Sequence, residues 1–276
     1  MGKIKTQIIK IPNQKIAGKI VLISDIHYYS KKDLNKLNKV LTMIKDINPN
    51  YICILGDTCD QARILDEDLL IDWLSKLAQV NKVIMVYGNH DLALYKEHVS
   101  YFNEKLFNKI RQIKNLYLLD NKIREDSDIC FIGLKLDYAY YYETKEDEYE
   151  FVKHYNKVVK KLNSDKYNIL LTHSPIALTQ DGVIKKLNDY QKLDLILCGH
   201  MHGGLMPKCL RSVFKNNGLV SPNKHKLLIK NAYGSFKIGN INFIVSDGVT
   251  KLSHVSKMSF FDRLFSPEIV LIELEK

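Results

Sequence analysis

The sequence predicts an α/β fold with four layers, an α/β/β/α sandwich in which two mixed sheets pack together between flanking helices. Short apolar runs rich in β-branched residues recur along the chain, which is typical of strands covered on both faces. Helical periodicity separates the early runs and indicates βαβ units with a largely parallel first sheet. Shorter strands separated by turns follow in the second half and supply the second sheet.

The individual elements follow from these patterns in chain order. The expected early and central strands are Lys19–Ser24, Tyr51–Leu55, Val83–Tyr87, Ile129–Leu134, Asn168–Leu171 and Leu195–Cys198. The expected late strands are Lys226–Ile229, Phe236–Ile238, Ile241–Val245 and Ile269–Leu274. Apolar residues three and four positions apart share one helix face, and this spacing predicts helices at Lys32–Asp46, Leu69–Val80, Glu97–Ile110 and Glu148–Leu162.

The composition is that of an ordinary globular protein. Of the 276 residues, 46% are hydrophobic and 26% are charged, which allows a sizeable core. No Pro/Gly/Ser-rich stretch divides the chain, so we expect a single domain over residues 1–276, with a cap or specificity segment at residues 203–229. The start lacks the apolar region of a secretory signal, and no run approaches the roughly 20 apolar residues of a spanning helix. The five cysteines form no C-x-x-C pair, which predicts a reduced, cytoplasmic protein.

The net charge is +10, from 41 Lys and Arg against 31 Asp and Glu. Such a surplus favours anionic partners, which include phosphate esters, nucleic acid and acidic lipid. The alternative is a generally lysine-rich composition without any such partner. Because the lysines are scattered rather than gathered in one block, nucleic acid is not the favoured partner.

Five polar patches each follow an apolar run. They are Asp25-Ile26-His27, Gly56-Asp57, Gly88-Asn89-His90-Asp91, Thr172-His173 and Gly199-His200-Met201-His202. Ligands of open α/β sheets lie beyond the carboxyl ends of the strands, so we expect the patches to converge. Together they offer a bridging carboxylate, neutral imidazoles and an amide oxygen, which are the groups that a two-metal site for phosphoester hydrolysis needs.

Taken singly, the patches differ in strength. A lone His27 or His173 is more often a surface or core histidine than a ligand. His200 and His202 are stronger candidates, because alternate residues of an extended segment face one side. Glycine precedes several candidate ligands, where the chain must turn sharply or leave room for an ion.

The order of the patches resembles that of the calcineurin-like metallophosphoesterases. The family pattern D-x-H, G-D, G-N-H-(D/E), H and G-H-x-H is matched in order between Ile20 and His202. The later sequence Ser266-Pro267-Glu268-Ile269 resembles a bacterial phosphodiesterase branch of this family. The resemblance implies a metal-dependent hydrolase of phosphoester bonds, with a binuclear metal site at the C-terminal ends of the strands.

The resemblance also implies roles for individual residues. One divalent metal ion would be bound by Asp25, His27 and His202, and the second by Asn89, His173 and His200. Asp57 would bridge both ions, and a hydroxide between them would be the nucleophile. His90 would protonate or stabilise the leaving group, with Asp91 orienting its ring. The mixed oxygen and nitrogen ligands favour Mn2+, with Fe or Zn as alternatives.

Residues beside the bridging carboxylate have two interpretations. Asp60 and Arg63 follow Gly56-Asp57, and we expect a solvated loop pair rather than contacts to a substrate phosphate. Cys59 fits no ligand position and is expected to be a small packing residue. The tyrosines of residues 137–149 would form an aromatic wall at the site or, as the favoured alternative, pack on the body of the protein.

Two later segments combine basic and apolar residues. Residues 203–229 would either cap the site and grip an acidic group or form a basic, solvated loop. Residues 257–265 would either rest on a bilayer surface or dock on the body, and docking is favoured. Four further histidines have no such context: His98, His154, His225 and His254.

We therefore expect a phosphodiesterase or pyrophosphatase that acts on a small-molecule or lipid-linked phosphoester. It would have no transmembrane segment and would lie in the cytoplasm, with peripheral membrane contact as an extension of that prediction. A nuclease and a phosphoprotein phosphatase are the enzymatic alternatives on the same fold. The alternative from another class is a noncatalytic metal-binding interaction module. Which residues contact the substrate stays open.

Overall fold

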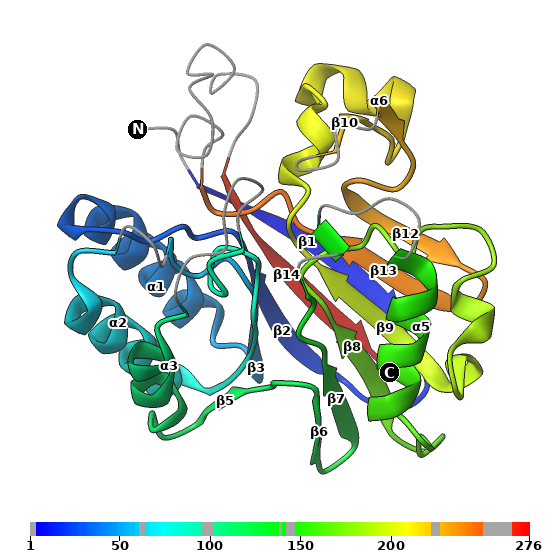
Figure 1. Cartoon of the computed structure of the whole chain (residues 1–276), viewed down its shortest axis with the longest axis horizontal. Coiled ribbons are helices and arrows are strands. Elements are labelled where there is room, and N and C mark those ends of the chain that lie inside the picture. The colour runs from blue at the N-terminus through cyan, green and yellow to red at the C-terminus, as the bar shows by residue number, and fades with distance from the viewer. Residues whose placement is uncertain are drawn as a thin grey trace.

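Two six-stranded sheets lie face to face in the centre of the molecule (Figure 1). Helices α1 (Leu34–Ile47), α2 (Glu67–Val80) and α3 (Glu104–Arg111) cover the outer face of the first sheet, and α5 (Asp147–Val158) covers that of the second. This arrangement confirms the predicted α/β/β/α sandwich. The computed structural model describes residues 4–60, 64–94, 102–137, 140–141, 147–221, 227–250 and 267–276.

The first sheet has the strand order β1-β14-β2-β3-β4-β5. Its members are β1 (Lys5–Pro12), β14 (Glu268–Glu275), β2 (Gly18–Ile23), β3 (Tyr51–Leu55), β4 (Lys82–Val86) and β5 (Leu116–Leu118). Strands β2 to β5 run parallel and are connected through α1, α2 and α3, as the βαβ pattern predicts. The prediction that the late strands supply the second sheet is wrong for β14, which is inserted between β1 and β2. It is also wrong for β11 (Leu227–Ile229), which pairs in a separate two-stranded sheet.

Four strands are absent from the sequence-based prediction: β1, β5, β6 (Lys122–Asp126) and β10 (Gly218–Val220). The residues of β1 are mostly exposed or half-buried because the strand lies at the edge of its sheet, so no apolar run marks it. Strand β5 has only three residues. None of the four strands carries a predicted metal ligand.

The second sheet has the order β12-β13-β9-β8-β7-β6. Its members are β12 (Gly234–Ile238), β13 (Ile241–Val245), β9 (Leu193–Cys198), β8 (Tyr167–Leu171), β7 (Ile129–Gly133) and β6 (Lys122–Asp126). The four inner strands run parallel, and antiparallel hairpins close both edges. The two sheets therefore present several parallel-strand ends, where loops can meet.

Two helices begin or end away from their predicted positions. Helix α3 begins at Glu104 rather than Glu97, and the Asn103 side chain caps it by accepting from the Leu106 N–H at 3.0 Å. Residues 95–101, on which the predicted start falls, lie outside the described residues. Helix α5 ends at Val158 rather than Leu162.

Alternation of side chains along the strands divides the core into layers. In β2, Ile20 and Leu22 pack in the cluster between the sheets, whereas Val21 and Ile23 pack in the cluster beneath α1, α2 and α3. All four side chains are almost completely buried. Each such aliphatic side chain contributes about 1.5–3 kcal/mol to folding. The strands that carry the candidate site are thus held rigidly on both faces.

A small lobe follows β9. It contains η4 (His202–Leu205), η5 (Lys208–Leu210), α6 (Arg211–Phe214) and the separate hairpin of β10 (Gly218–Val220) and β11 (Leu227–Ile229). We call residues 203–221 and 227–230 the cap lobe; Figure 1 shows α6 and β10 projecting beyond the second sheet. Among the described residues, no helix combines the length and the apolar character that crossing a bilayer requires.

Candidate metal centre

Loops after five parallel strands bring the predicted polar patches to one edge of the sandwich. Strands β2, β3 and β4 of the first sheet lead into the loops of Asp25, Asp57 and Asn89, and β8 and β9 of the second lead into those of His173 and His200. Backbone bonds lock neighbouring loops together: the His27 N–H donates to the Asp57 carbonyl at 2.9 Å, and the Gly199 N–H to the His173 carbonyl at 2.9 Å.

Five candidate ligands have left-handed backbone conformations. Their φ angles are 52° at Asp25, 46° at His27, 48° at Asp57, 69° at His200 and 45° at His202. Residues other than glycine rarely adopt this region, and each such residue costs roughly 1–3 kcal/mol. The surrounding fold holds this strained backbone conformation in the loops that carry the candidate ligands.

A buried lysine supports the first of these loops. The Lys36 Nζ, on α1, donates to the Ile26 carbonyl at 2.8 Å and lies 2.9 Å from the Thr250 hydroxyl oxygen. Its partner carboxylate is Asp33, at 3.5 Å. Burial lowers the pKa of Lys36, although Asp33 opposes that shift. The lysine thereby fixes the carbonyl between Asp25 and His27.

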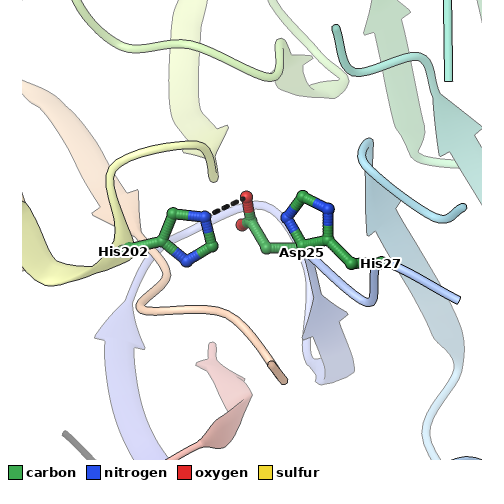
Figure 2. Close-up of side chains that lie close together, drawn as sticks. All are labelled: Asp25, His27 and His202. Carbon is green, nitrogen blue, oxygen red and sulfur yellow. Dashed lines mark ion pairs between the residues drawn. The ribbon is translucent and has the colours of Figure 1, made fainter. Parts of the chain in front are cut away.

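The first group of candidate ligands consists of Asp25, His27 and His202. One donor atom from each lies within 4.8 Å of the others. Figure 2 shows the two rings on either side of the Asp25 carboxylate, with His202 Nε2 3.7 Å from Asp25 Oδ1. The ring centroids of His27 and His202 are 5.6 Å apart. The His200 N–H donates to the Asp25 carboxylate, which links this group to the next one.

The second group consists of Asp57, His173 and His200, again within 4.8 Å. His173 Nε2 lies 3.1 Å from Asp57 Oδ2, and its Nδ1 lies 2.6 Å from the Leu55 carbonyl oxygen. The carbonyl can only accept, so Nδ1 carries a proton and Nε2 is directed toward Asp57. The rings of His173 and His200 are 4.9 Å apart in an edge-to-face arrangement.

Asp57 also belongs to a third group, with His27 and His90. Its Oδ2 lies 3.8 Å from His27 Nε2, and its Oδ1 accepts from the His90 N–H at 2.8 Å. The carboxylate is therefore placed between the Asp25 group and the His173 group. This is the position that a carboxylate shared by two cations requires.

Electrostatics keep these groups in the protonation states that metal ligands need. Burial raises the pKa of Asp57, but His173 and His90 outweigh it and hold that pKa well below its usual range. Burial, followed by the proximity of His90, holds the pKa of His27 well below its usual value. Burial and His173 do the same for the pKa of His200. A neutral imidazole offers the lone pair that a metal ion binds.

The pKa of His173 is raised instead. Burial lowers it, but Asp57 outweighs burial and raises the pKa of His173 to about 9. A cation at this position would displace the proton from Nε2, because imidazole binds metals only in its neutral form. Cation binding and proton release are thus coupled at this ring.

Several buried donor and acceptor atoms fit a cation. Within the described part of the chain, His27 Nε2, His200 Nε2 and Asn89 Oδ1 are buried and have no hydrogen-bond partner. Leaving such atoms unpaired costs about 1–3 kcal/mol each. Imidazole nitrogens, an amide oxygen and two carboxylates together match the donor set of a transition-metal pair. The residues present therefore fit two divalent cations.

Gly88 allows the loop after β4 to approach Asp57 closely. A Cβ atom on Gly88 would collide with the backbone nitrogen and the carboxylate oxygen of Asp57. We expect Gly88→Ala to cost about 1–3 kcal/mol of stability through overpacking and to weaken metal binding. Thermal unfolding and metal analysis would measure both effects. Gly182→Ala is the control, because Gly182 has φ +80° but open space around it, so it should leave the metal content unchanged.

The expected role of Asp91, orienting the His90 ring, stays a prediction; the contacts that the structure shows for its carboxylate are with backbone N–H groups. Its Oδ1 accepts from the N–H groups of Thr58 and Cys59 at 2.9 and 3.0 Å, and its Oδ2 from the Gly88 N–H at 2.9 Å. Three backbone donors therefore engage Asp91, which ties the loop of β3 to that of β4. Burial and the nearby Asp57 raise the pKa of Asp91 to about 6.

The carboxylate beside the His90 ring is Asp60. Its Oδ1 lies 3.8 Å from His90 Nδ1, and the residue is only 6% exposed. The expectation of a solvated Asp60–Arg63 loop pair is therefore wrong for Asp60, and Arg63 lies outside the described residues. Burial lowers the pKa of His90, but Asp57 and Asp60 outweigh it and raise that pKa. The sequence signal that marks Asp60 is its spacing, three residues after Asp57.

Other predictions are settled by burial. Cys59 is completely buried and packs in the core, as expected. Tyr140 and Tyr141 are buried, as packing on the body predicts, and the Tyr141 ring also lies 5.1 Å from the ring of the candidate ligand His200. Tyr149 is exposed instead. Tyr138 and Tyr142 lie outside the described residues. His154 Nε2 lies 2.6 Å from Asn121 Oδ1, away from the candidate ligands.

Asp247 is a buried carboxylate that the sequence analysis did not single out. It follows β13, whose end lies beside that of β9, and its Oδ2 pairs with Arg211 Nη1 of the cap lobe at 2.6 Å. A Cβ on Gly203 would collide with the Arg211 guanidinium. The signal was again an apolar strand followed by a polar turn, Ser246-Asp247-Gly248. Residues 257–265, His98, His225 and His254 lie outside the described residues.

The fold and this centre define a class of protein, the α/β sandwich enzymes with a cluster of metal-binding side chains at the strand ends. The sequence model of the calcineurin-like phosphoesterases matches residues 18–204, which include every predicted ligand, and the chain belongs to this family. Members of the family hydrolyse phosphoester bonds with divalent metals in a binuclear site. The family that the sequence resembles is thus confirmed.

Named relatives agree with this assignment. An uncharacterized metallophosphoesterase of Campylobacter jejuni is 30% identical over 99% of this chain and 63% of its own length. An uncharacterized metallophosphoesterase of Helicobacter pylori is 26% identical over 67% of this chain and 45% of its own length. The chain thus spans about half to two thirds of these relatives. The crystal structure of TT1561 of Thermus thermophilus matches the fold, with a TM-score of 0.52 and 11% identity over 84% of this chain and 90% of that one.

Proposed function

We propose that the protein is a phosphodiesterase or pyrophosphatase that acts on a small-molecule or lipid-linked phosphoester. The observation that carries the proposal is the position of Asp57, whose carboxylate is shared between two groups of buried candidate ligands. A carboxylate in that position offsets the repulsion of two cations held close together. A carboxylate shared in this way is expected of a two-metal hydrolase and not of a protein with one structural cation.

We assign two sets of ligands from the three groups and leave His90 outside both sets. One cation would be held by Asp25, His27 and His202, and the other by His173, His200 and Asn89, with Asp57 common to both. Asn89 is included because its buried Oδ1 has no hydrogen-bond partner among the described residues, and because Gly88 and His90 on either side of it contact Asp57. The mixed O and N donors favour manganese over iron or zinc.

When bound, the two cations supply a water of lowered pKa and stabilise the charge that grows on the phosphoryl oxygens. The chain's own contribution at the leaving group is His90, which is partly exposed beside the ligands. Asp57 and Asp60 favour its protonated form. His90 can therefore give a proton to the departing oxygen, while Asp60 stabilises the imidazolium.

Asp60→Asn tests this positioning. We expect turnover to fall by about 10- to 100-fold, because the change removes a charged partner worth roughly 1.5–3 kcal/mol. The metal content should not change, since Asp60 belongs to none of the three candidate ligand groups. In a His90→Ala background the same substitution should have little further effect. Additive losses in the double variant would show that Asp60 acts independently of His90.

A substrate panel tests the class of reaction. Bis(p-nitrophenyl) phosphate, p-nitrophenyl phosphate, cyclic nucleotides, nucleoside diphosphate conjugates and single-stranded DNA would each be assayed with added Mn2+. We expect the diester or the diphosphate conjugates to be the best substrates. Cleavage restricted to the monoester would overturn the proposal in favour of a phosphatase, and cleavage restricted to DNA would favour a nuclease. Two bound metals without turnover of any substrate would indicate the noncatalytic module.

We also propose a reducing, cytoplasmic location. All five cysteines are free, and four of them are buried among apolar side chains. Burial raises the pKa of Cys53 and of Cys198, which keeps both as unreactive thiols. Cell fractionation with thiol labelling would test this location, and recovery of the protein in an oxidised, extracellular fraction would contradict it.

A further inference from the structure

The cap lobe exposes an unusual share of large apolar side chains. Nine large hydrophobic residues are exposed in the described chain, and five of them lie in this lobe: Leu210, Val213, Phe214, Leu227 and Leu228. Three are exposed by 71% or more. Such a concentration on a small projecting element marks an interaction surface, since scattered single residues need no partner but clustered ones do.

The same part of the chain carries no acidic residue. From Leu195 to Ser246 the sequence contains no Asp or Glu, and its seven cations are Lys208, Arg211, Lys215, Lys224, Lys226, Lys230 and Lys237. The net charge of this segment is therefore +7, against +10 for the whole protein. Lys215 and Lys230 are exposed in the lobe itself. Positive charge is thus present in the same lobe as the exposed apolar side chains.

Buried ion pairs attach the lobe firmly to the site. Arg211 pairs with Asp247, which is 8% exposed, and Lys208 pairs with Glu268, which is 7% exposed, at 3.3 Å. The Tyr233 hydroxyl donates to the Lys215 carbonyl at 3.0 Å. The lobe continues directly from the candidate ligand His202. A partner that binds the lobe would therefore lie next to the metal centre.

We propose that the cap lobe docks on a bilayer of anionic lipid and presents the metal centre to phosphoesters at that surface. Apolar side chains enter the headgroup boundary, while lysines around them attract the negative surface. The docking is inferred from the cap lobe alone. The claim that the metal centre then acts on phosphoesters at the bilayer rests on the proposed function, and it narrows the substrate to lipid-linked phosphoesters.

The type of exposed side chain favours lipid over nucleic acid. Four of the five exposed residues are aliphatic, and only Phe214 has a ring. Single-stranded nucleic acid is held by successive aromatic platforms on which bases stack. Aliphatic side chains gain nothing from stacking but do gain from leaving water. A basic surface with leucine and valine at its tip therefore matches a lipid surface.

Vesicle co-sedimentation of the full chain tests the docking. We expect binding to phosphatidylcholine vesicles that contain phosphatidylglycerol and much weaker binding to phosphatidylcholine alone. The variant Lys215→Gln/Lys230→Gln should weaken binding roughly 10- to 30-fold, since one lysine near an anionic surface contributes about fivefold. Val213→Ser/Leu227→Ser should weaken binding to a similar degree. All four positions are exposed, so the variants should fold, which circular dichroism would verify.

Matched controls lie elsewhere on the surface. Lys19→Gln/Lys45→Gln removes two exposed lysines, and Ile8→Ser/Leu65→Ser removes two exposed apolar residues, all outside the lobe. Both should bind vesicles within about twofold of the wild type. The docking proposal is overturned if the wild type ignores anionic vesicles, if lobe and control variants bind alike, or if single-stranded DNA displaces the vesicles.

Activity separates this proposal from the proposed function. The lobe variants should still hydrolyse bis(p-nitrophenyl) phosphate in solution, because none of the four positions is a candidate ligand. Vesicle binding without any hydrolysis would leave the docking intact and count against the enzyme. Hydrolysis without vesicle binding would retain the enzyme and reject the docking.

Discussion

Asp57→Asn is expected to remove both metal ions and nearly all hydrolytic activity. The carboxylate belongs to two of the candidate ligand groups, with Oδ2 3.1 Å from His173 Nε2 and 3.8 Å from His27 Nε2. An amide has no charge to offset two cations and only one oxygen to share. Loss of a residue that only hydrogen-bonds to a metal ligand costs about 10- to 100-fold in metal affinity. Because Asp57 would itself be a ligand, we expect the affinity for each of the two cations to fall by more than about 100-fold.

Metal analysis after equilibration with Mn2+ would measure this loss directly, and it does not depend on the natural substrate. The matched control is Asp194→Asn, which removes a half-buried carboxylate paired with Lys15 at 2.8 Å near the opposite end of β9. That variant should retain two ions. If Asp57→Asn also keeps two tightly bound ions, Asp57 does not bridge them.

His90→Ala is expected to keep both metals but to slow turnover by about 10²- to 10⁴-fold, the usual cost of lost general-acid assistance. The ring lies beside Asp60 on one side and 4.6 Å from the His27 ring on the other, at the edge of the ligand groups. The loss should be larger for an alkyl leaving group than for p-nitrophenolate, because a weakly basic leaving group needs less protonation.

Comparing leaving groups makes this prediction specific. His154→Ala is the control, because it removes another half-buried histidine that is hydrogen-bonded to Asn121, and it should leave turnover unchanged. Equal losses for both leaving groups would indicate that His90 binds the substrate rather than donating a proton. An unchanged rate with both would remove His90 from the mechanism.

Much of the fold could be predicted because its signals are local. The runs of β2, β3 and β4 are apolar after their first residues, since both faces of these strands are buried there, and the helices between them carry an apolar stripe. The pairing of strands that are far apart in the sequence left no such signal. Strand β14 pairs with β1 and β2, more than 200 residues earlier in the chain, and nothing in its own residues selects the first sheet over the second.

The seven predicted ligands are found at the strand ends for the same local reason. Each follows a recognisable strand, and the carboxyl ends of parallel strands lie at one edge. Their surroundings are a different matter. Asp60 and Asp91 both lie within a few residues of predicted ligands. Their spacing does not reveal which one lies beside the His90 ring and which one accepts from backbone N–H groups.

The sequence by itself determined the layers, the positions of the ligand-bearing loops and the family, because hydrophobic periodicity and motif order are written along the chain. Only the tertiary structure decided which carboxylate faces His90, that backbone N–H groups engage Asp91, and that the cap lobe is pinned through Arg211 and Asp247. Those outcomes depend on burial and on distances between loops from different strands. Burial and these distances are set when the two sheets pack together, so they cannot be obtained from the spacing of residues in the sequence.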